Sequence, residues 1–305
     1  MSVRPRWSQC LAAAAIAVAS LGLSAGPSGP TRSVAQAESI SLEVPPPARQ
    51  ASGTCRAQLG QGLDATLDSF GVANSEWGIA VKSLQTGRTL YRHNAQHPLI
   101  PASNTKLLTV AAAFRQWDAP LNDRHRARVK RILHYSDNSL ADSLLSGLGG
   151  PQVASRSLSQ LGLTEANYRQ ADGSGLSRRN AVTASSLVSL LAAMPDSNHW
   201  ALFYSSLPVA GQSGTLSHRL QDTAASGQIR AKTGTLHGVR ALSGYAETAD
   251  FGRVAFSILA NNPNGAGSCL VAAIDKIALQ LAQLQQCQQP LAESAQGVGT
   301  GKGES

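Results

Sequence analysis

The chain has 305 residues, of which 42% are hydrophobic, 14% charged and 5% aromatic. Because disorder requires few apolar residues and a high charge density, this composition excludes an intrinsically disordered chain. Four Cys and 28 Gly without a triplet repeat also exclude a disulfide-dense scaffold and a collagen. The net charge of +8 raises the question of a nucleic-acid or membrane partner, and the positions of the charges bear on it.

The first 37 residues have the pattern of a secretory signal peptide. A basic start with Arg4 and Arg6 precedes an apolar run over residues 10–23, and an A-x-A site ends at Ala37. The run is shorter than the roughly 20 residues of a membrane-spanning helix, which favours cleavage and export over a membrane anchor. Without this segment 23 basic residues face 18 acidic ones, a net charge of +5. We therefore expect an exported protein of the periplasm or cell-wall space, soluble after cleavage, with no nucleic-acid partner.

The remaining chain alternates between helical and strand patterns. Residues 38–54 are rich in proline and small residues and are expected to form a linker. The last residues, 291–305, are polar and glycine-rich and are expected to be a disordered tail. Between them the sequence predicts, in order, a helix over 55–70, a hairpin of strands 77–84 and 88–93, a mostly helical block over 99–215, strands at 227–233, 238–247 and 253–260, and a helix over 268–286.

These elements predict one α/β domain over residues 55–290. A two-stranded hairpin is not stable alone, so strands from both ends of the domain are expected to share one mostly antiparallel sheet. The N- and C-terminal helices would cover a face of that sheet. The sheet part would comprise 55–98 and 216–290, the inserted helical part 99–215, and a cleft would lie between them.

The cysteines leave two alternatives open. Cys10 leaves with the leader, so Cys55, Cys269 and Cys287 remain. Cys269 and Cys287 lie at opposite ends of one predicted helix, about 27 Å apart, and cannot pair with each other. The sequence therefore favours a disulfide from Cys55 to Cys287 or Cys269, and three buried free thiols are the alternative.

Three short motifs carry the chemistry. They are Ser103-Asn104-Thr105-Lys106 before a helical run, Ser136-Asp137-Asn138, and Lys232-Thr233-Gly234-Thr235 at the end of a predicted strand. Each motif alone is common, but the three in this order are typical of serine enzymes that react with penicillin.

The residue types fit nucleophilic catalysis. A serine hydroxyl needs a base, and Lys106 lies on the same helix face as Ser103. A desolvated lysine near other cations loses its proton more readily and can be that base. Ser136 can pass a proton to a leaving amine, and Asn138 can hold a substrate amide.

The third motif suits a substrate that ends in a carboxylate, because Lys232 supplies a cation and Thr233 a hydroxyl. Gly234 lets its strand approach a substrate closely. The backbone N–H groups of Ser103 and Thr235 are expected to form an oxyanion hole.

Longer stretches of sequence resemble one family. These stretches are Pro101-Ala102-Ser103-Asn104-Thr105-Lys106, Ala171-Asp172-Gly173-Ser174-Gly175-Leu176-Ser177-Arg178, Ser206-Leu207-Pro208-Val209-Ala210-Gly211, Gly214-Thr215-Leu216 and Arg230-Ala231-Lys232-Thr233-Gly234-Thr235-Leu236 with Leu242-Ser243-Gly244-Tyr245. With them the chain resembles, over about 77–262, the D-alanyl-D-alanine carboxypeptidase/endopeptidase family typified by penicillin-binding protein 4, peptidase family S13.

The resemblance implies a β-lactamase/DD-peptidase-like fold and cleavage of the terminal D-Ala-D-Ala bond of peptidoglycan stem peptides, with penicillin and other β-lactams as reactants. DD-endopeptidase activity on cross-links is a second activity of the family. Members usually carry long inserted domains between the first two motifs. Here only residues 107–135 separate Lys106 from Ser136, so those insertions and their substrate contacts are expected to be missing.

Two other functions compete with this one. A class A β-lactamase shares the three motifs but needs a glutamate that activates the deacylating water. Glu165 is the only glutamate between the second and third motifs, and its context, Glu165-Ala166-Asn167-Tyr168, does not match E-x-x-L-N. A catalytically silent wall-binding protein is disfavoured because all three motifs are intact.

Two further expectations concern partners and cofactors. Neither a G-x-S-x-G motif nor a histidine pattern of a metal site occurs, so no metal or cofactor is expected. The basic run Arg124, Arg126, Arg128, Lys130 and Arg131 is either a solvated helix face or a contact for anionic wall polymer or lipid head groups. Asp172-Gly173-Ser174-Gly175 is interpreted as a turn that lines the cleft rather than a second nucleophile.

Overall fold

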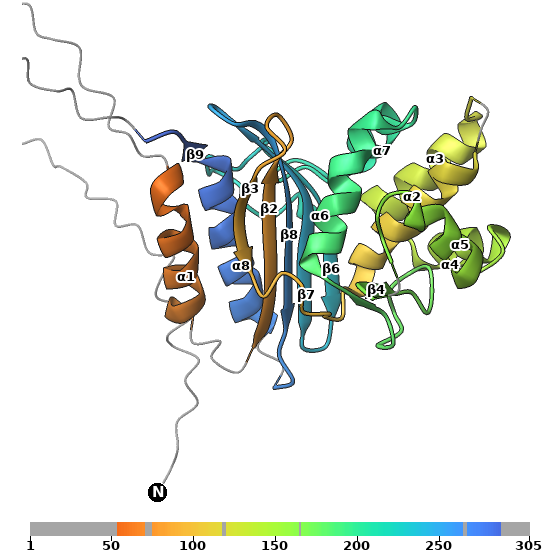
Figure 1. The fold of residues 1–305 in the computed structure, drawn as a ribbon, viewed down its shortest axis with the longest axis horizontal. Coiled ribbons are helices and arrows are strands. Elements are labelled where there is room, and N and C mark those ends of the chain that lie inside the picture. The colour runs from red at the N-terminus through yellow and green to blue at the C-terminus, as the bar shows by residue number, and fades with distance from the viewer. Residues whose placement is uncertain (1–53, 71–74, 118–119, 165, 265–266, 288–305) are drawn as a thin grey trace, which may run out of the picture. The chain divides into compact units, whose positions relative to one another are not determined.

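A five-stranded antiparallel sheet forms the centre of the fold (Figure 1). The computed structural model describes residues 54–70, 75–117, 120–164, 166–264 and 267–287. In spatial order the sheet consists of β3 (Thr89–His93), β2 (Glu76–Ser83), β8 (Gly252–Asn261), β7 (Val239–Thr248) and β6 (Ile229–Leu236). The prediction that strands from both ends of the domain share one sheet is confirmed by the pairing of β2 with β8.

One face of the sheet is covered by the two terminal helices. α8 (Gly267–Ala282) packs against β7, and α1 (Leu59–Ser69) packs on α8 (Figure 1). Both helices bury an apolar stripe, including Leu59 and Leu63 from α1 and Ile274 and Ile277 from α8, in a core shared with the sheet. This arrangement confirms the layer predicted from the periodicity of the two helices.

The helical part lies over the opposite face. α6 (Ala184–Ala193) contacts β2, β7 and β8, and the other helices gather beyond it. They are α2 (Thr105–Gln116), α3 (Asp123–His134), α4 (Asn138–Gly147), α5 (Pro151–Ser159) and α7 (Trp200–Ser206) (Figure 1). α2 is buried on every side over its first ten residues, as expected of a helix in the middle of a packed subdomain.

Some short elements were not predicted. The pairs β1 (Thr54–Cys55) with β9 (Leu284–Gln285), which is parallel, and β4 (Tyr168–Arg169) with β5 (Ala181–Val182), which is antiparallel, carry no periodicity because each strand has two residues. The last helix ends at Ala282, four residues before its predicted end, and the chain continues into β9. The predicted leader, Cys10, nearly all of the linker and the tail lie outside the described residues.

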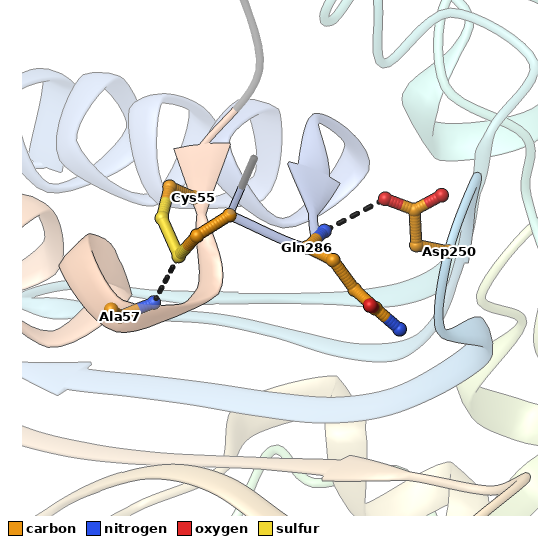
Figure 2. The surroundings of a disulfide bond; sticks show 5 residues. Cys55, Ala57, Asp250 and Gln286 are labelled. Carbon is orange, nitrogen blue, oxygen red and sulfur yellow. Dashed lines mark hydrogen bonds between the residues drawn. A yellow bond between two sulfur atoms is a disulfide. The ribbon is translucent and has the colours of Figure 1, made fainter. Parts of the chain in front are cut away.

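A disulfide joins the two ends of the described chain. Cys55, the second residue of β1, is bonded to Cys287, which follows β9, across a sequence separation of 232. The Ala57 N–H donates to the Cys287 sulfur at 3.3 Å, and the Gln286 N–H donates to the Asp250 carboxylate at 2.7 Å (Figure 2). Of the two pairings that the sequence left open, the structure has the one with Cys287. Because Cys287 lies beyond α8, the 27 Å helix argument does not apply to it.

Replacing both Cys55 and Cys287 by serine is expected to destabilise the fold by about 2–4 kcal/mol, since a long loop in the unfolded chain is no longer closed. For a chain of this size each kcal/mol lowers the melting temperature by roughly 2–4 °C. Thermal unfolding followed by circular dichroism measures the change. An unchanged melting temperature would show that β1–β9 pairing and the α1–α8 contact hold the two ends without the bond.

The fold brings the predicted motifs to one place. The 3-10 turn η2 (Ala102–Asn104), which leads into α2, contacts β6 and β7. The first motif therefore touches the strand of the third motif. β6 is the last strand of the sheet. Its outer edge pairs with residues 208–210 at its first residues, through the isolated bridge Val209–Arg230, and has no further strand beside it beyond residue 231 in the described sheet. Among the described residues no helix is long and apolar enough to cross a bilayer.

Candidate active site

Ser103 and Lys106 sit at the junction of a 3-10 turn and the central helix. Ser103 lies in η2, and Lys106 is the second residue of α2, with its Nζ 2.9 Å from the Ser103 Oγ. Ala102, directly before the serine, is buried and has φ +48°, a left-handed conformation that is costly for a residue with a Cβ. The structure therefore holds the nucleophile candidate on a strained turn that its surroundings stabilise.

Lys106 is a fully buried cation with three oxygen neighbours. Besides Ser103, its Nζ donates to the Asn138 Oδ1 at 2.8 Å and to the Ser174 carbonyl at 2.6 Å. Both of these oxygens can only accept, so they occupy two N–H groups, while the serine hydroxyl can also donate. A neutral Lys106 would thus turn its lone pair to the Ser103 hydroxyl, which is the geometry of a general base.

Burial lowers the pKa of Lys106 from its ordinary value to about 8, and the negative charges of Asp142, Asp172 and Asp137 limit that fall. A substantial fraction of the amine is therefore neutral at mildly alkaline pH. This protonation state is the one that can accept the proton of Ser103.

The second motif is held by its middle residue. The Asp137 side chain caps α4 by accepting from the Leu140 N–H at 2.9 Å, and it forms a 2.7 Å salt bridge with Arg131. Ser136, on one side of this anchor, has φ +62°. Asn138, on the other side, directs its Oδ1 at Lys106.

Lys232 forms a second serine–lysine pair. Its fully buried amine donates to the Ser136 Oγ at 3.0 Å and to the Thr233 carbonyl at 2.9 Å. Burial, and secondarily the positive charge of Lys106, hold the pKa of Lys232 well below its usual range. Lys232 and Ser136 can therefore exchange a proton beside the first serine–lysine pair.

The strand of the third motif presses against the turn that holds Ser103. A Cβ on Gly234 would lie 2.6 Å from the Pro101 carbonyl oxygen and 3.3 Å from the Ala102 Cβ, so only glycine fits there. Thr233 is half-buried and Thr235 is exposed. The oxyanion hole expected from the Ser103 and Thr235 backbone N–H groups stays a prediction.

The sequence did not identify the residues that hold the loop opposite Lys106. The Asp142 Oδ1 accepts from the N–H groups of Gly173 and Ser174 at 2.9 and 2.8 Å. The Asp172 carboxylate accepts from the Gly175 N–H at 2.7 Å and the Ser177 N–H at 2.6 Å.

Asp172-Gly173-Ser174-Gly175 is thus a turn at the site, as predicted, but the group it contributes to Lys106 is a backbone carbonyl, that of Ser174. An Asp before Gly-Ser-Gly indicates such a turn, whereas nothing near Asp142 in sequence points to it.

Replacing Asp142 by asparagine is expected to lower the pKa of Lys106 further below about 8, since a negative charge that raises this pKa is lost. The asparagine oxygen can still accept from both backbone N–H groups, so the loop keeps its anchor. NMR titration of the labelled lysine side chain measures the midpoint. The control is Asp68→Asn on α1, and an unchanged or raised midpoint in Asp142→Asn would contradict the electrostatic argument.

Solved structures place the fold in the class shared by penicillin-binding proteins and β-lactamases. Penicillin-binding protein 4 from Haemophilus influenzae superposes with a TM-score of 0.60 at 15% identity, covering 75% of this chain and 99% of that one. A β-lactamase from Sphaerobacter thermophilus superposes with a TM-score of 0.58 at 19% identity, covering 72% and 94%. The predicted fold class is confirmed.

The chain belongs to the D-Ala-D-Ala carboxypeptidase 3 (S13) family, whose model matches residues 59–124 and 119–283. A D-alanyl-D-alanine carboxypeptidase from an Actinomadura species is 39% identical over 206 residues, 60% of this chain and 38% of that protein. Carboxypeptidase DacB from Mycolicibacterium smegmatis is 36% identical over 165 residues, 48% and 36% of the two proteins. The chain thus spans less than half the length of these relatives, and the resemblance to the family is confirmed.

Proposed function

We propose that the protein is an exported serine-type D-Ala-D-Ala carboxypeptidase that acts on peptidoglycan stem peptides and is acylated by β-lactams. The observation that carries this proposal is the Lys106 amine, which is buried, 2.9 Å from the Ser103 Oγ and held by two carbonyl-type oxygens. The family of the chain and the names of its relatives support the same reaction.

In the proposed reaction the Ser103 Oγ attacks the carbonyl carbon of the penultimate D-Ala while its proton passes to the Lys106 Nζ. The peptide C–N bond then breaks, and the leaving nitrogen takes a proton from the Ser136 hydroxyl, which Lys232 reprotonates. Terminal D-Ala departs and leaves an ester on Ser103. Water hydrolyses this ester: the acyl group leaves as a carboxylic acid and the serine regains its proton. The cycle closes when the proton that Lys106 took up returns to Lys232, which gave one to Ser136.

The substrate contacts we propose follow from the positions of the remaining motif residues. Lys232 and the Thr233 hydroxyl face the carboxylate of the terminal D-Ala, and the Asn138 Nδ2 group donates to a peptide carbonyl. Gly234 and Thr235 belong to β6, and the substrate backbone would run beside them. The edge of β6 beyond residue 231 supports this placement, because only its first residues pair with residues 208–210 and an extended peptide can pair with the rest.

Two measurements test the proposal. Pentapeptide muropeptides incubated with the protein should lose one D-Ala by mass spectrometry, and cleaved cross-links in the same sample would report DD-endopeptidase activity. Labelled penicillin should attach to the peptide that contains Ser103. Absence of both products would contradict the proposal, and labelling without D-Ala release would favour a silent penicillin-binding protein.

A β-lactamase is the second candidate because the fold is shared with these enzymes. The two functions differ in how fast water removes the acyl group, for which class A enzymes use a glutamate. Glu165 lies outside the described residues. A penicillin adduct that persists for many minutes supports the peptidase, whereas rapid release of hydrolysed penicillin supports the lactamase.

We also propose that residues 1–37 direct export and that α3 contacts anionic wall polymer. In support, Arg124, Arg126 and Lys130 are exposed on α3, whereas Arg131 is paired with Asp137. Binding to isolated walls should weaken with salt and with Arg124→Gln/Lys130→Gln, but not with the control Arg88→Gln. Salt-insensitive binding would contradict the contact. Export is tested by the N-terminal residue of the secreted protein.

A further inference from the structure

The loop between α7 and β6 is fixed along one side by the sheet. The Ala210 N–H donates to the Ile229 carbonyl at 2.9 Å, and the Ala231 N–H donates to the Pro208 carbonyl at 3.0 Å. Farther along the loop, near its middle, the side chain of Leu216 is fully buried in the core beneath the sheet. The residues in between are therefore held in place although several of them are exposed.

The other side of this loop is pressed against the end of α3. Gly214 has φ +61°, and a Cβ there would lie 2.8 Å from the His134 carbonyl oxygen and 3.1 Å from its ring. His134 precedes Ser136 by two residues. The next loop residue, Thr215, is thus positioned between the strand of the third motif and the segment of the second motif.

Thr215 touches a motif residue directly. Its Oγ1 lies 2.7 Å from the Oγ1 of Thr233, and either hydroxyl can be the donor. Thr215 is exposed and Thr233 is half-buried, so a ligand can reach the pair. Lys232, adjacent in the chain, donates to the Thr233 carbonyl and the Ser136 hydroxyl, so its amine joins the backbone of Thr233 to the second motif.

We propose that Thr215 is a positioning residue for the substrate carboxylate, acting through Thr233; this inference rests on the proposed function. A hydroxyl has one proton to donate and two lone pairs that accept. A carboxylate cannot donate, so Thr233 must give it the single proton. Thr233 is then free to accept from Thr215. The two successive hydrogen bonds, from Thr215 to Thr233 and from Thr233 to the carboxylate, point in the same direction and polarise each other.

The test compares two substrates that differ only at the C-terminus, an N-acyl-D-Ala-D-Ala peptide and its C-terminal amide. Thr215→Val keeps the shape but removes the donor, and it should raise KM for the acid about fivefold with kcat unchanged. The amide should show no such change, and Thr215→Ser should restore the wild-type KM. Thr86→Val, in the exposed β2–β3 turn, is the matched control.

Equal effects on acid and amide, or an unchanged KM for the acid, would overturn the inference. Penicillin labelling and D-Ala release by the wild-type protein are measured in parallel. If both fail, the proposed function is contradicted, and the inference about Thr215 is then tested by the binding of the two peptides rather than by their turnover. In Ser103→Ala, which binds without reacting, the ratio of the affinities for the acid and the amide peptide is measured. This ratio should fall about fivefold in Ser103→Ala/Thr215→Val, and an unchanged ratio would overturn the inference.

Discussion

Replacing Lys106 by alanine is expected to reduce the rate at which Ser103 is acylated by a β-lactam by about 10³-fold or more. The amine is the neighbour of the Ser103 hydroxyl that can accept its proton, and it also links the nucleophile turn to Asn138 and the Ser174 carbonyl. The rate is measured with labelled penicillin in a stopped time course. Ser103→Ala provides the reference for complete loss, and Lys276→Ala on the exposed side of α8 is the control.

The pH dependence of acylation in the wild-type protein tests the same assignment. Lys106 must be neutral to accept a proton, and burial lowers its pKa to about 8. The rate should therefore rise with pH through about 8 and level off above it, instead of rising up to the ordinary lysine range. A profile that is flat between roughly pH 6 and 10, or retention of the rate in Lys106→Ala, would contradict the role of Lys106 as base.

Replacing Gly175 by alanine is expected to reduce acylation by about 100-fold, because a displacement near 1 Å at the nucleophile costs that much. Gly175 has φ +86°, and a Cβ there would clash with the Ala102 carbonyl and lie 3.0 Å from the Thr105 Oγ1. Ala102 is buried backbone directly before Ser103, so the turn itself would have to shift. Acylation rate and thermal unfolding are measured together.

Gly162→Ala separates the two effects of this substitution. Gly162 also has a positive φ, +78°, but among the described residues no atom lies within 4 Å of its built Cβ. Gly162→Ala should lower the free energy of unfolding by only roughly 1–2 kcal/mol, the cost of alanine in a left-handed conformation. It should leave the acylation rate unchanged. If Gly175→Ala behaved like Gly162→Ala in both measurements, close packing of Gly175 on the nucleophile turn would not matter for the reaction.

The sheet and its helices were predictable because their signals are local. Strands β6, β7 and β8 lie within three residues of the predicted bounds, since each contains apolar or β-branched residues and is bounded by turn residues. The short pairs β1–β9 and β4–β5 were missed because two residues contain no period. The end of α8 was placed late because Leu284 is apolar and buried, like the helix residues before it.

The site was predictable to the extent that it is written in contiguous motifs. Ser103 and Lys106 are three residues apart, and a helix brings such neighbours together whatever the rest of the chain does. Asp142 and Thr215 lie far in sequence from the groups they contact, in loops or helices without a distinctive pattern. Their roles emerge only where backbone N–H groups or hydroxyls from distant segments meet them.

The sequence by itself determined the order of the motifs, the family, the shared sheet and the pairing of Ser103 with Lys106. Only the tertiary structure decided which cysteine joins Cys55, which carbonyl holds Lys106 and how far the pKa of that lysine falls. The physical reason is that these properties depend on burial and on contacts between distant segments. A pattern of neighbours along the chain does not specify how deeply a side chain is removed from water.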